Sequence, residues 1–164
     1  MTLTPVLLIT PRINRLNRLP YVLRRWKGAI SLAVYITEEE LSSLEEIILV
    51  HAHHSRIVFT AYIVKAITPS NTPFYTLPNG NHLSYPNGFY PVNTMRDLAI
   101  ESISTTHCFV VDADMFPSDT IESSINQYRN VLSDHHNMIV VSSFEYRKRP
   151  SLAKCFSEGD CDEL

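Results

Sequence analysis

Two carboxylates separated by one residue are the side chains of this sequence best suited to chemistry. Asp112 and Asp114 follow the apolar run 109–111, which is typical of a buried strand. Side chains alternate along a strand, so the two carboxylates can point the same way where it ends. They would repel each other unless a hard divalent cation, Mg²⁺ or Mn²⁺, lies beside them with phosphate oxygens and water. The structural alternative is a turn and helix cap before Pro117.

A second pair of polar residues follows Pro91, a residue type common at helix starts. Asn93 and Arg96 are three residues apart and therefore share one helix face near its N-terminus. The guanidinium of Arg96 is suited to bind a phosphate or carboxylate through two parallel hydrogen bonds. The alternative is a surface helix in which Arg96 pairs with a nearby acid.

The elements that must position these residues alternate between strands and helices. Apolar, β-branched runs predict strands at 6–10, 30–36, 57–63, 108–111 and 138–141. Apolar residues spaced by three and four predict four helices. One ends before Gly28, one follows a capping box of Thr37 and Glu40, one begins at Pro91, and one spans 121–132. Asp119 and Glu122 resemble a second capping pair. This order predicts an α/β fold with a mostly parallel sheet covered on both faces, and such sheets bind ligands beyond the carboxyl ends of their strands.

Residues 68–91 interrupt this alternation. The segment holds five of the ten prolines and two Asn-Gly pairs, which are turn signals, so it reads as a long irregular loop. The sequence after residue 145 is polar, charged and without a period. We therefore expect one domain at 1–145, which includes the loop 68–91, and a flexible polar tail at 146–164.

Composition excludes several classes of protein. The chain has 164 residues, 45% hydrophobic and 19% charged, with a net charge of −3, which is an ordinary globular balance and argues against a nucleic-acid-binding surface. No apolar run reaches the roughly 18 residues of a membrane span. Three cysteines make neither a disulfide scaffold nor a zinc knuckle. The basic residues between Arg12 and Lys27 are interpreted as a solvated helix face, and the histidines at 51–54 and 135–136 as solvated loop residues without a companion Cys or Glu.

Three ordered segments of the sequence resemble glycosyltransferase family 49. They are 26–35 (WKGAISLAVY, with Ala29 where the family usually has Pro), 90–99 (Tyr-Pro-Val-Asn-x-x-Arg-Asp-x-Ala) and 109–118 around the two carboxylates. The resemblance extends from about residue 5 to about residue 145. It implies a GT-A fold, a Rossmann-like sheet that binds a nucleotide sugar, here incomplete at the C-terminus.

The resemblance also implies an activity, namely metal-dependent transfer of a sugar, glucuronic acid foremost, from a UDP-sugar to a glycan or glycoprotein acceptor in the Golgi lumen. By motif position, Asp112 and Asp114 would serve Mn²⁺ or Mg²⁺, and Asn93, Arg96 and Asp112 would bind the donor. In the family, the general base and a further metal ligand lie beyond the matched segment. No catalytic residue is therefore assigned.

Two other functions remain open at this point. One is a truncated, non-catalytic remnant that binds at most a UDP-sugar. The other is a metal-dependent phosphotransferase, because phosphatases of the haloacid-dehalogenase type also place Asp-x-Asp after an apolar strand. Those enzymes carry the motif on their opening strand and follow it with a different sequence. Here Met115 and Phe116 follow the motif and at least three strands precede it, which counts against that class.

Overall fold

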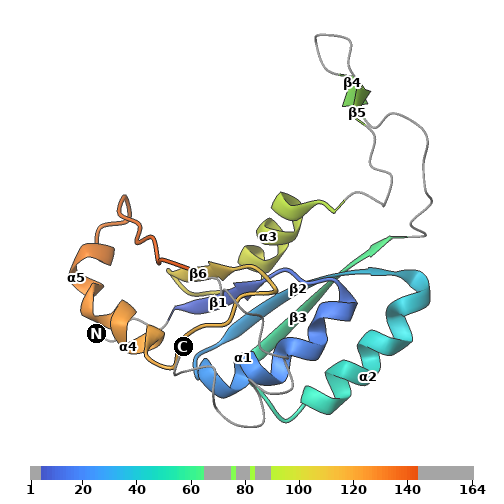
Figure 1. The fold of residues 1–164 in the computed structure, drawn as a ribbon, viewed down its shortest axis with the longest axis horizontal. Helices are drawn as coiled ribbons and strands as arrows, with labels where there is room; N and C mark the ends of the chain where they lie inside the picture. Colours follow the sequence, from blue (N-terminus) through green and yellow to red (C-terminus); the bar gives the residue numbers. More distant parts are fainter. Residues whose placement is uncertain (1–4, 65–74, 77–81, 84–89, 144–164) are drawn as a thin grey trace, which may run out of the picture.

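Four parallel strands form the sheet of this protein in a computed structural model that describes residues 5–64, 75–76, 82–83 and 90–143 (Figure 1). The strands are β1 (Val6–Ile9), β2 (Ile30–Thr37), β3 (Ile57–Val64) and β6 (Cys108–Val111), in the order β3-β2-β1-β6. In the middle of the sheet Leu7 pairs with Ile30 on one side and with Phe109 on the other. Since all four strands run the same way, their carboxyl ends meet at one edge, as the alternating sequence predicts.

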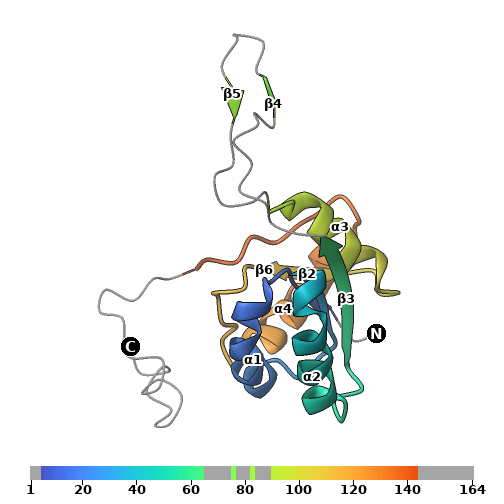
Figure 2. The same ribbon diagram turned by 90° about the vertical axis from the view of Figure 1, so that its right-hand side faces the viewer.

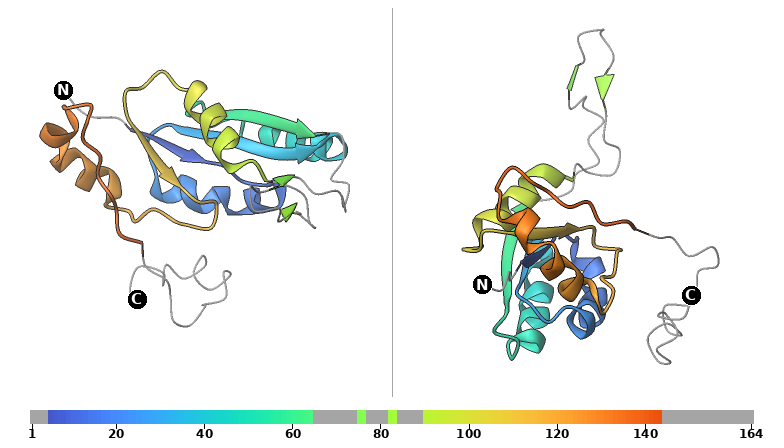
Figure 3. Two further views of the ribbon diagram at one scale, coloured as in Figure 1. Left: turned by 90° about the horizontal axis from the view of Figure 1, so that it is seen from above. Right: turned by 90° about the vertical axis from the view of Figure 1, so that its left-hand side faces the viewer.

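Helices cover both faces of this sheet, which confirms the predicted α/β class (Figures 2 and 3). One face carries the 3₁₀ helix η1 (Ile13–Arg18) with α1 (Leu19–Arg25), α2 (Leu41–His51) and α4 (Ile121–Gln127), and α3 (Val92–Glu101) lies on the other. Alternate residues of β1 divide between the two faces: Leu7 and Ile9 pack toward α1, and Val6 and Leu8 toward α3. Burial on both faces explains why these strands are continuously apolar in sequence.

Trp26 is fully buried just after α1 and joins that helix to the sheet. Its Nε1 donates a hydrogen bond to the carbonyl of Ala29 at 2.9 Å. Its ring stacks on Phe109 of β6 with 5.9 Å between the centroids. The turn that follows is held by Arg56, which donates to the carbonyl groups of Leu23 and Gly28 at 3.0 and 3.1 Å.

Of the two predicted capping pairs, the structure contains one. The carboxylate of Glu40 accepts the backbone N–H of Thr37 at 2.9 Å, which opens η2 (Glu38–Glu40) and then α2. The pair Asp119 and Glu122 is wrong as a cap, because the N-cap of α4 is Thr120 and no side chain caps it. The carboxylate of Glu122 instead accepts backbone N–H groups from the turn after α1, and Asp119 lies 3.6 Å from Arg25.

The predicted strand at 138–141 is also wrong. The chain leaves α5 (Arg129–Leu132) and passes through 138–143 with neither helix nor strand (Figure 3). The side chains of Met138 and Val140 are 83% and 84% exposed. A β-branched run becomes a strand only where a neighbour supplies hydrogen bonds, and no strand pairs with this run in the described part of the chain. The predicted helix over 121–132 likewise divides at Tyr128 into α4 and α5.

Only part of the predicted irregular loop 68–91 lies within the described residues. There, β4 (Tyr75–Thr76) and β5 (His82–Leu83) pair as antiparallel strands, which the sequence did not predict. Both Asn-Gly pairs and the tail 146–164 lie outside the described residues, so the domain division stays a prediction. In the part of the chain that the structure describes, no helix is both long and apolar enough to cross a membrane.

Candidate functional site at the carboxyl edge of the sheet

The two carboxylates predicted to do chemistry lie in one tight turn at the carboxyl end of β6. The strand ends at Val111, and the backbone N–H of Met115 donates to the carbonyl of Asp112 at 3.0 Å. A turn, and not the alternation of a strand, therefore sets the directions of Asp112 and Asp114. Both side chains are exposed, so their oxygen atoms are accessible to a ligand.

The structure brings the two polar motifs of the sequence together. Arg96 Nη2 of α3 lies 3.3 Å from Asp112 Oδ1, and both side chains are partly exposed. Asn93 is exposed one turn earlier on the same helix. The turn and this ion pair are also what the purely structural alternatives predict for the two motifs. Those alternatives do not account for the other side chains that surround the pair at the carboxyl edge of the sheet.

The position of Arg96 depends on how α3 is fixed to the sheet. Met95 and Ala99 of this helix are fully buried against β1 and β2. The buried hydroxyl of Ser31 on β2 donates to the carbonyl of Ala99 at 2.8 Å. That carbonyl belongs to the last turn of α3, where the helix itself offers no donor. Ser31 thus satisfies a helix end and fixes the helix that carries Arg96.

A second positive side chain, Arg12, lies at the same edge in an aromatic setting. It follows β1, and its guanidinium carbon is 5.7 Å from the ring centroids of both Tyr35 and Tyr90. Both distances are within the range of cation–π attraction. The rings of Tyr35 and Tyr90 meet edge to face at 5.5 Å, and the Tyr90 hydroxyl donates to the carbonyl of Thr10. We call Arg12, Tyr35, Tyr90, Arg96 and Asp112 the edge cluster.

The pKa of Tyr90 responds to several charged members of the edge cluster. Burial raises the pKa of the Tyr90 phenol above its ordinary value of 10.0, and the negative charge of Asp112 acts in the same direction. The hydrogen bond to Thr10 and the positive charges of Arg12 and Arg96 act in the opposite direction. The phenol therefore keeps its proton at neutral pH and continues to donate to Thr10. Charges from the segment after β1, from α3 and from the turn after β6 all act on this one group.

Chemically, this edge combines two guanidinium groups with two accessible carboxylates. The guanidinium groups suit phosphate or carboxylate groups of a ligand, and the carboxylate oxygens suit a hard divalent cation. Arg12 was missed because the basic residues up to Lys27 were read as one solvated helix face. That reading is wrong for Arg12, which precedes η1 and packs on Tyr35 and Tyr90. Arg12 lies three residues after β1 ends, and a charged residue close behind an apolar strand is the signal that singles out Asp112 and could also have found Arg12.

A parallel sheet with helices on both faces places this chain in the α/β class, in which ligands are commonly bound at the carboxyl edge of the sheet. A family model described as "Glycosyl-transferase for dystroglycan" matches residues 67–155, which is more than half of the chain. The chain therefore belongs to this family of glycosyltransferases.

Relatives with the same kind of name match over most of the chain. The xylosyl- and glucuronyltransferase LARGE1 of Homo sapiens is 29% identical over 89% of this chain and 17% of its own length. LARGE2s of Danio rerio, also named a xylosyl- and glucuronyltransferase, is 29% identical over 89% of this chain and 18% of its own. The glycosyltransferase-like protein gnt14 of Dictyostelium discoideum is 26% identical over 84% of this chain and 19% of its own. The chain thus spans less than a fifth of the length of these relatives.

Among solved structures, the crystal structure of S. aureus TarS 1-349 superposes with a TM-score of 0.42 and 11% identity, over 88% of this chain and 40% of that chain. The fold class of the present chain rests on its own strand order and on the helices that cover both faces.

Proposed function

We propose that this chain is the donor-binding part of a glycosyltransferase that uses a UDP-sugar, UDP-glucuronic acid foremost, and transfers the sugar to a glycan or glycoprotein acceptor. The observation that carries this proposal is the contact between Arg96 and Asp112 beside Asp114, at the carboxyl edge of the sheet. Membership of a glycosyltransferase family and the names of the two LARGE relatives support the reaction and the sugar.

We assign Asp112 and Asp114 to a divalent cation, Mn²⁺ or Mg²⁺. The donor set fits, because both groups are exposed carboxylates in one turn, and hard cations of this kind prefer oxygen ligands. When bound, the cation supplies Lewis-acid stabilisation of the charge that develops on the departing UDP. Asp112 already lies beside a positive group, so its ion pair with Arg96 would link the cation site to the helix that carries Asn93.

We assign the two arginines of the edge cluster to the negative groups of the donor. A UDP-sugar carries a diphosphate, and UDP-glucuronic acid adds a carboxylate on the sugar. Arg96 lies nearest to the carboxylate turn and is the residue we place against the diphosphate or the sugar acid. Arg12 contacts the rings of both Tyr35 and Tyr90 and lies in position before a ligand arrives, which lowers the cost of ordering it.

Calorimetry with UDP in the presence of Mn²⁺ or of a chelator tests this assignment. We expect the chain to bind UDP more tightly with Mn²⁺, and Asp114→Asn to weaken that binding about tenfold or more because a cation ligand is lost. Asp119→Asn is the matched control, since it makes the same change of charge beside Arg25 and away from the turn. Absence of UDP binding by the unchanged chain, or equal binding by Asp114→Asn, would overturn the assignment.

A second candidate function is donor binding without transfer. The edge cluster contains one carboxylate, that of Asp112, and Asp114 lies beside it in the same turn; both are already assigned to the cation. The edge cluster therefore offers no spare carboxylate as a general base, which an acceptor hydroxyl would need. Radiolabelled UDP-glucuronic acid separates the two functions: released or transferred sugar supports the enzyme, whereas tight binding without turnover supports the binding protein.

We also propose the Golgi lumen as the place of action, on the family resemblance alone. Microscopy of the tagged protein against a Golgi marker tests this location. Coincidence of the two signals supports it, and a diffuse signal elsewhere in the cell contradicts it.

A further inference from the structure

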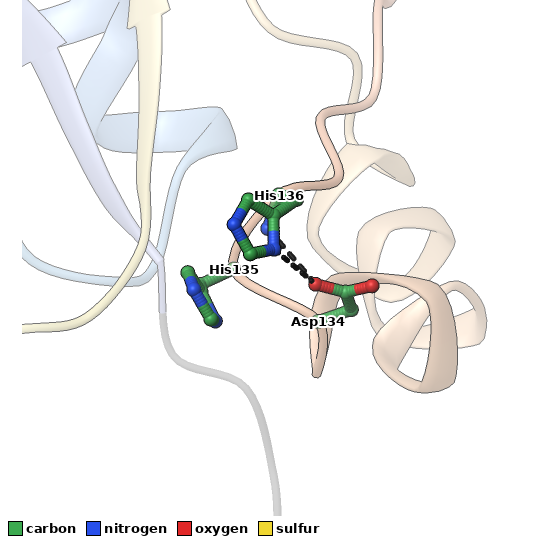
Figure 4. Close-up of side chains that lie close together, drawn as sticks. All are labelled: Asp134, His135 and His136. Atoms are coloured by element: carbon green, nitrogen blue, oxygen red, sulfur yellow. Dashed lines mark hydrogen bonds and ion pairs between the residues drawn. The ribbon is translucent and has the colours of Figure 1, made fainter.

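Three potential metal ligands gather far from the edge cluster, in the turn that follows α5. They are Asp134, His135 and His136, and all three are exposed (Figure 4). The end of α5 is held by His107, whose Nε2 lies 2.8 Å from the carbonyl of Leu132. Since His107 directly precedes β6, this turn lies near the amino end of the sheet, opposite to the carboxylates after β6.

The local geometry already orders two of these three side chains. Asp134 Oδ1 accepts the backbone N–H of His136 at 3.0 Å and lies 3.1 Å from His136 Nδ1. The rings of His135 and His136 are 3.9 Å apart between centroids and tilted by 40°. Figure 4 shows the carboxylate and the ring of His136 facing each other, with the ring of His135 alongside. One tripeptide thus supplies two imidazoles and a carboxylate within a small volume.

The spacing of the ligand atoms is compatible with a tetrahedral metal after small side-chain rotations. One ligand atom from each residue lies within 4.8 Å of the others, whereas the ligands of tetrahedral Zn²⁺ are about 3.4 Å apart, given metal–ligand bonds of roughly 2.0 to 2.1 Å. The side chains of His136 and Asp134 are 78% and 56% exposed, so they can rotate into solvent without displacing packed protein. Water would complete the coordination.

We propose that Asp134, His135 and His136 form a binding site for Zn²⁺ or a similar imidazole-preferring divalent metal. Two imidazoles select this class of metal over Mg²⁺ and Mn²⁺, which prefer oxygen ligands. The site is therefore distinct in chemistry as well as in place from the cation assigned to Asp112 and Asp114. The histidines at 135–136 were read as solvated residues because only Cys and Glu were considered as companions, and the structure adds Asp134.

A second histidine group provides an internal comparison. His51, His53 and His54 also lie close together, with ring centroids 3.9 Å apart for His53 and His54 and 6.1 Å apart for His51 and His54. Within the described ranges, however, only Asp134, His135 and His136 place three such ligand atoms within 4.8 Å of one another. His53 is exposed, so its replacement is a control for histidine loss as such.

Titration of the metal-free chain with Zn²⁺ against a fluorescent chelator tests the proposal. We expect one Zn²⁺ per chain at micromolar free metal. His136→Ala and Asp134→Asn should each weaken binding about tenfold or more, because one of three protein ligands is lost, and His53→Ala should leave it unchanged. Co²⁺ added in place of Zn²⁺ should give the intense visible absorption of a tetrahedral site, and this absorption should vanish in His136→Ala.

Two results would overturn the site. One is the absence of Zn²⁺ binding by the unchanged chain. The other is equal binding by the unchanged chain and by both His136→Ala and Asp134→Asn, which would place the metal elsewhere. The turn is exposed, so these variants should fold, and circular dichroism checks that they do. Asp114→Asn separates this result from the proposed function, since it should lose Mn²⁺-dependent UDP binding and keep Zn²⁺.

Discussion

The carboxylate of Glu122 joins α4 to the turn after α1. It accepts the backbone N–H of Lys27 at 3.1 Å and that of Gly28 at 2.6 Å. The same carboxylate explains why residue 28 is glycine, since a Cβ there would lie 2.7 Å from Glu122 Oε1 and 3.0 Å from Trp26 Nε1. A single acidic side chain thus holds the turn closed, and only the smallest residue fits beneath it.

This contact predicts a coupled effect of two substitutions on stability. Gly28→Ala should lower the free energy of unfolding by about 1 to 3 kcal/mol, because the new methyl group forces Glu122 or Trp26 to move. In a chain that already carries Glu122→Ala the same change should cost clearly less, since the nearest atom is gone. Urea unfolding of the four chains in this cycle measures both costs. Equal costs in the two backgrounds would show that the clash is not with Glu122.

At the scale of elements, α3 connects the core to the site. It is bound to β2 through Ser31 and Ala99, and it carries Arg96 to the turn after β6. The site therefore depends on where a buried helix rests and not only on the side chains that face solvent. Removal of a buried contact of α3 should therefore affect ligand binding, even though that contact lies in the core and not at the site.

Ser31→Ala tests this connection. It should cost about 1 to 3 kcal/mol in the free energy of unfolding, because a helix-end carbonyl loses its buried donor. Resting on the proposed function, it should also weaken Mn²⁺-dependent UDP binding several-fold. Trp26→Phe is the matched control, since it removes another buried donor to a backbone carbonyl, on the opposite face of the sheet. Equal weakening of UDP binding by the two variants would mean general loss of stability and not displacement of α3.

Sequence alone predicted the elements whose signals are local. The apolar runs of β1 and β2, the capping box at Thr37 and the proline before α3 each depend on neighbouring residues, and the structure contains all four. The predictions that failed concern features that depend on residues far away in the sequence. The run at 138–141 has strand-forming residues, but no strand among the described residues pairs with it, and Glu122 hydrogen-bonds a turn more than ninety residues earlier in the chain.

The residues of the candidate site show the same contrast between local and long-range sequence signals. The carboxylates of Asp112 and Asp114 were found because they follow an apolar run, and Arg96 because it follows a helix start. Whether they bind a cation and a donor stays a prediction. The contacts of Arg12 with Tyr35 and Tyr90 join three separate parts of the chain, so no local pattern contains them.

For the molecule as a whole, histidines link stability to pH. Burial lowers the pKa of His51 below its ordinary value of 6.5, and the charges of His54 and His53 lower it further. His51 Nδ1 is buried without a hydrogen-bond partner in the described part of the chain. Below pH 6.5 the unfolded chain therefore binds a proton at this residue more readily than the folded chain does.

The contribution of His51 to stability is fully present above pH 6.5 and is lost as the pH falls through its lowered folded pKa. His51→Gln should reduce the loss of stability between about pH 7 and pH 5.5, measured as the shift of the urea midpoint. An identical slope in His51→Gln and the unchanged chain would contradict this origin.

The pairing of β1 with β6 determines when the ligand edge comes into existence. Leu7 of β1 pairs with Ile30 of β2, and β1, β2 and β3 all come early in the sequence. These three strands can therefore associate while the rest of the chain is still being synthesised. The other neighbour of Leu7, Phe109, leaves the ribosome about a hundred residues later, at a synthesis rate of roughly 5 to 20 residues per second. Until then the open edge of β1 is a risk for misassociation. In this order of synthesis the turn with Asp112 and Asp114 follows the last strand of the sheet, so the donor binding proposed above would report that this strand has paired with β1.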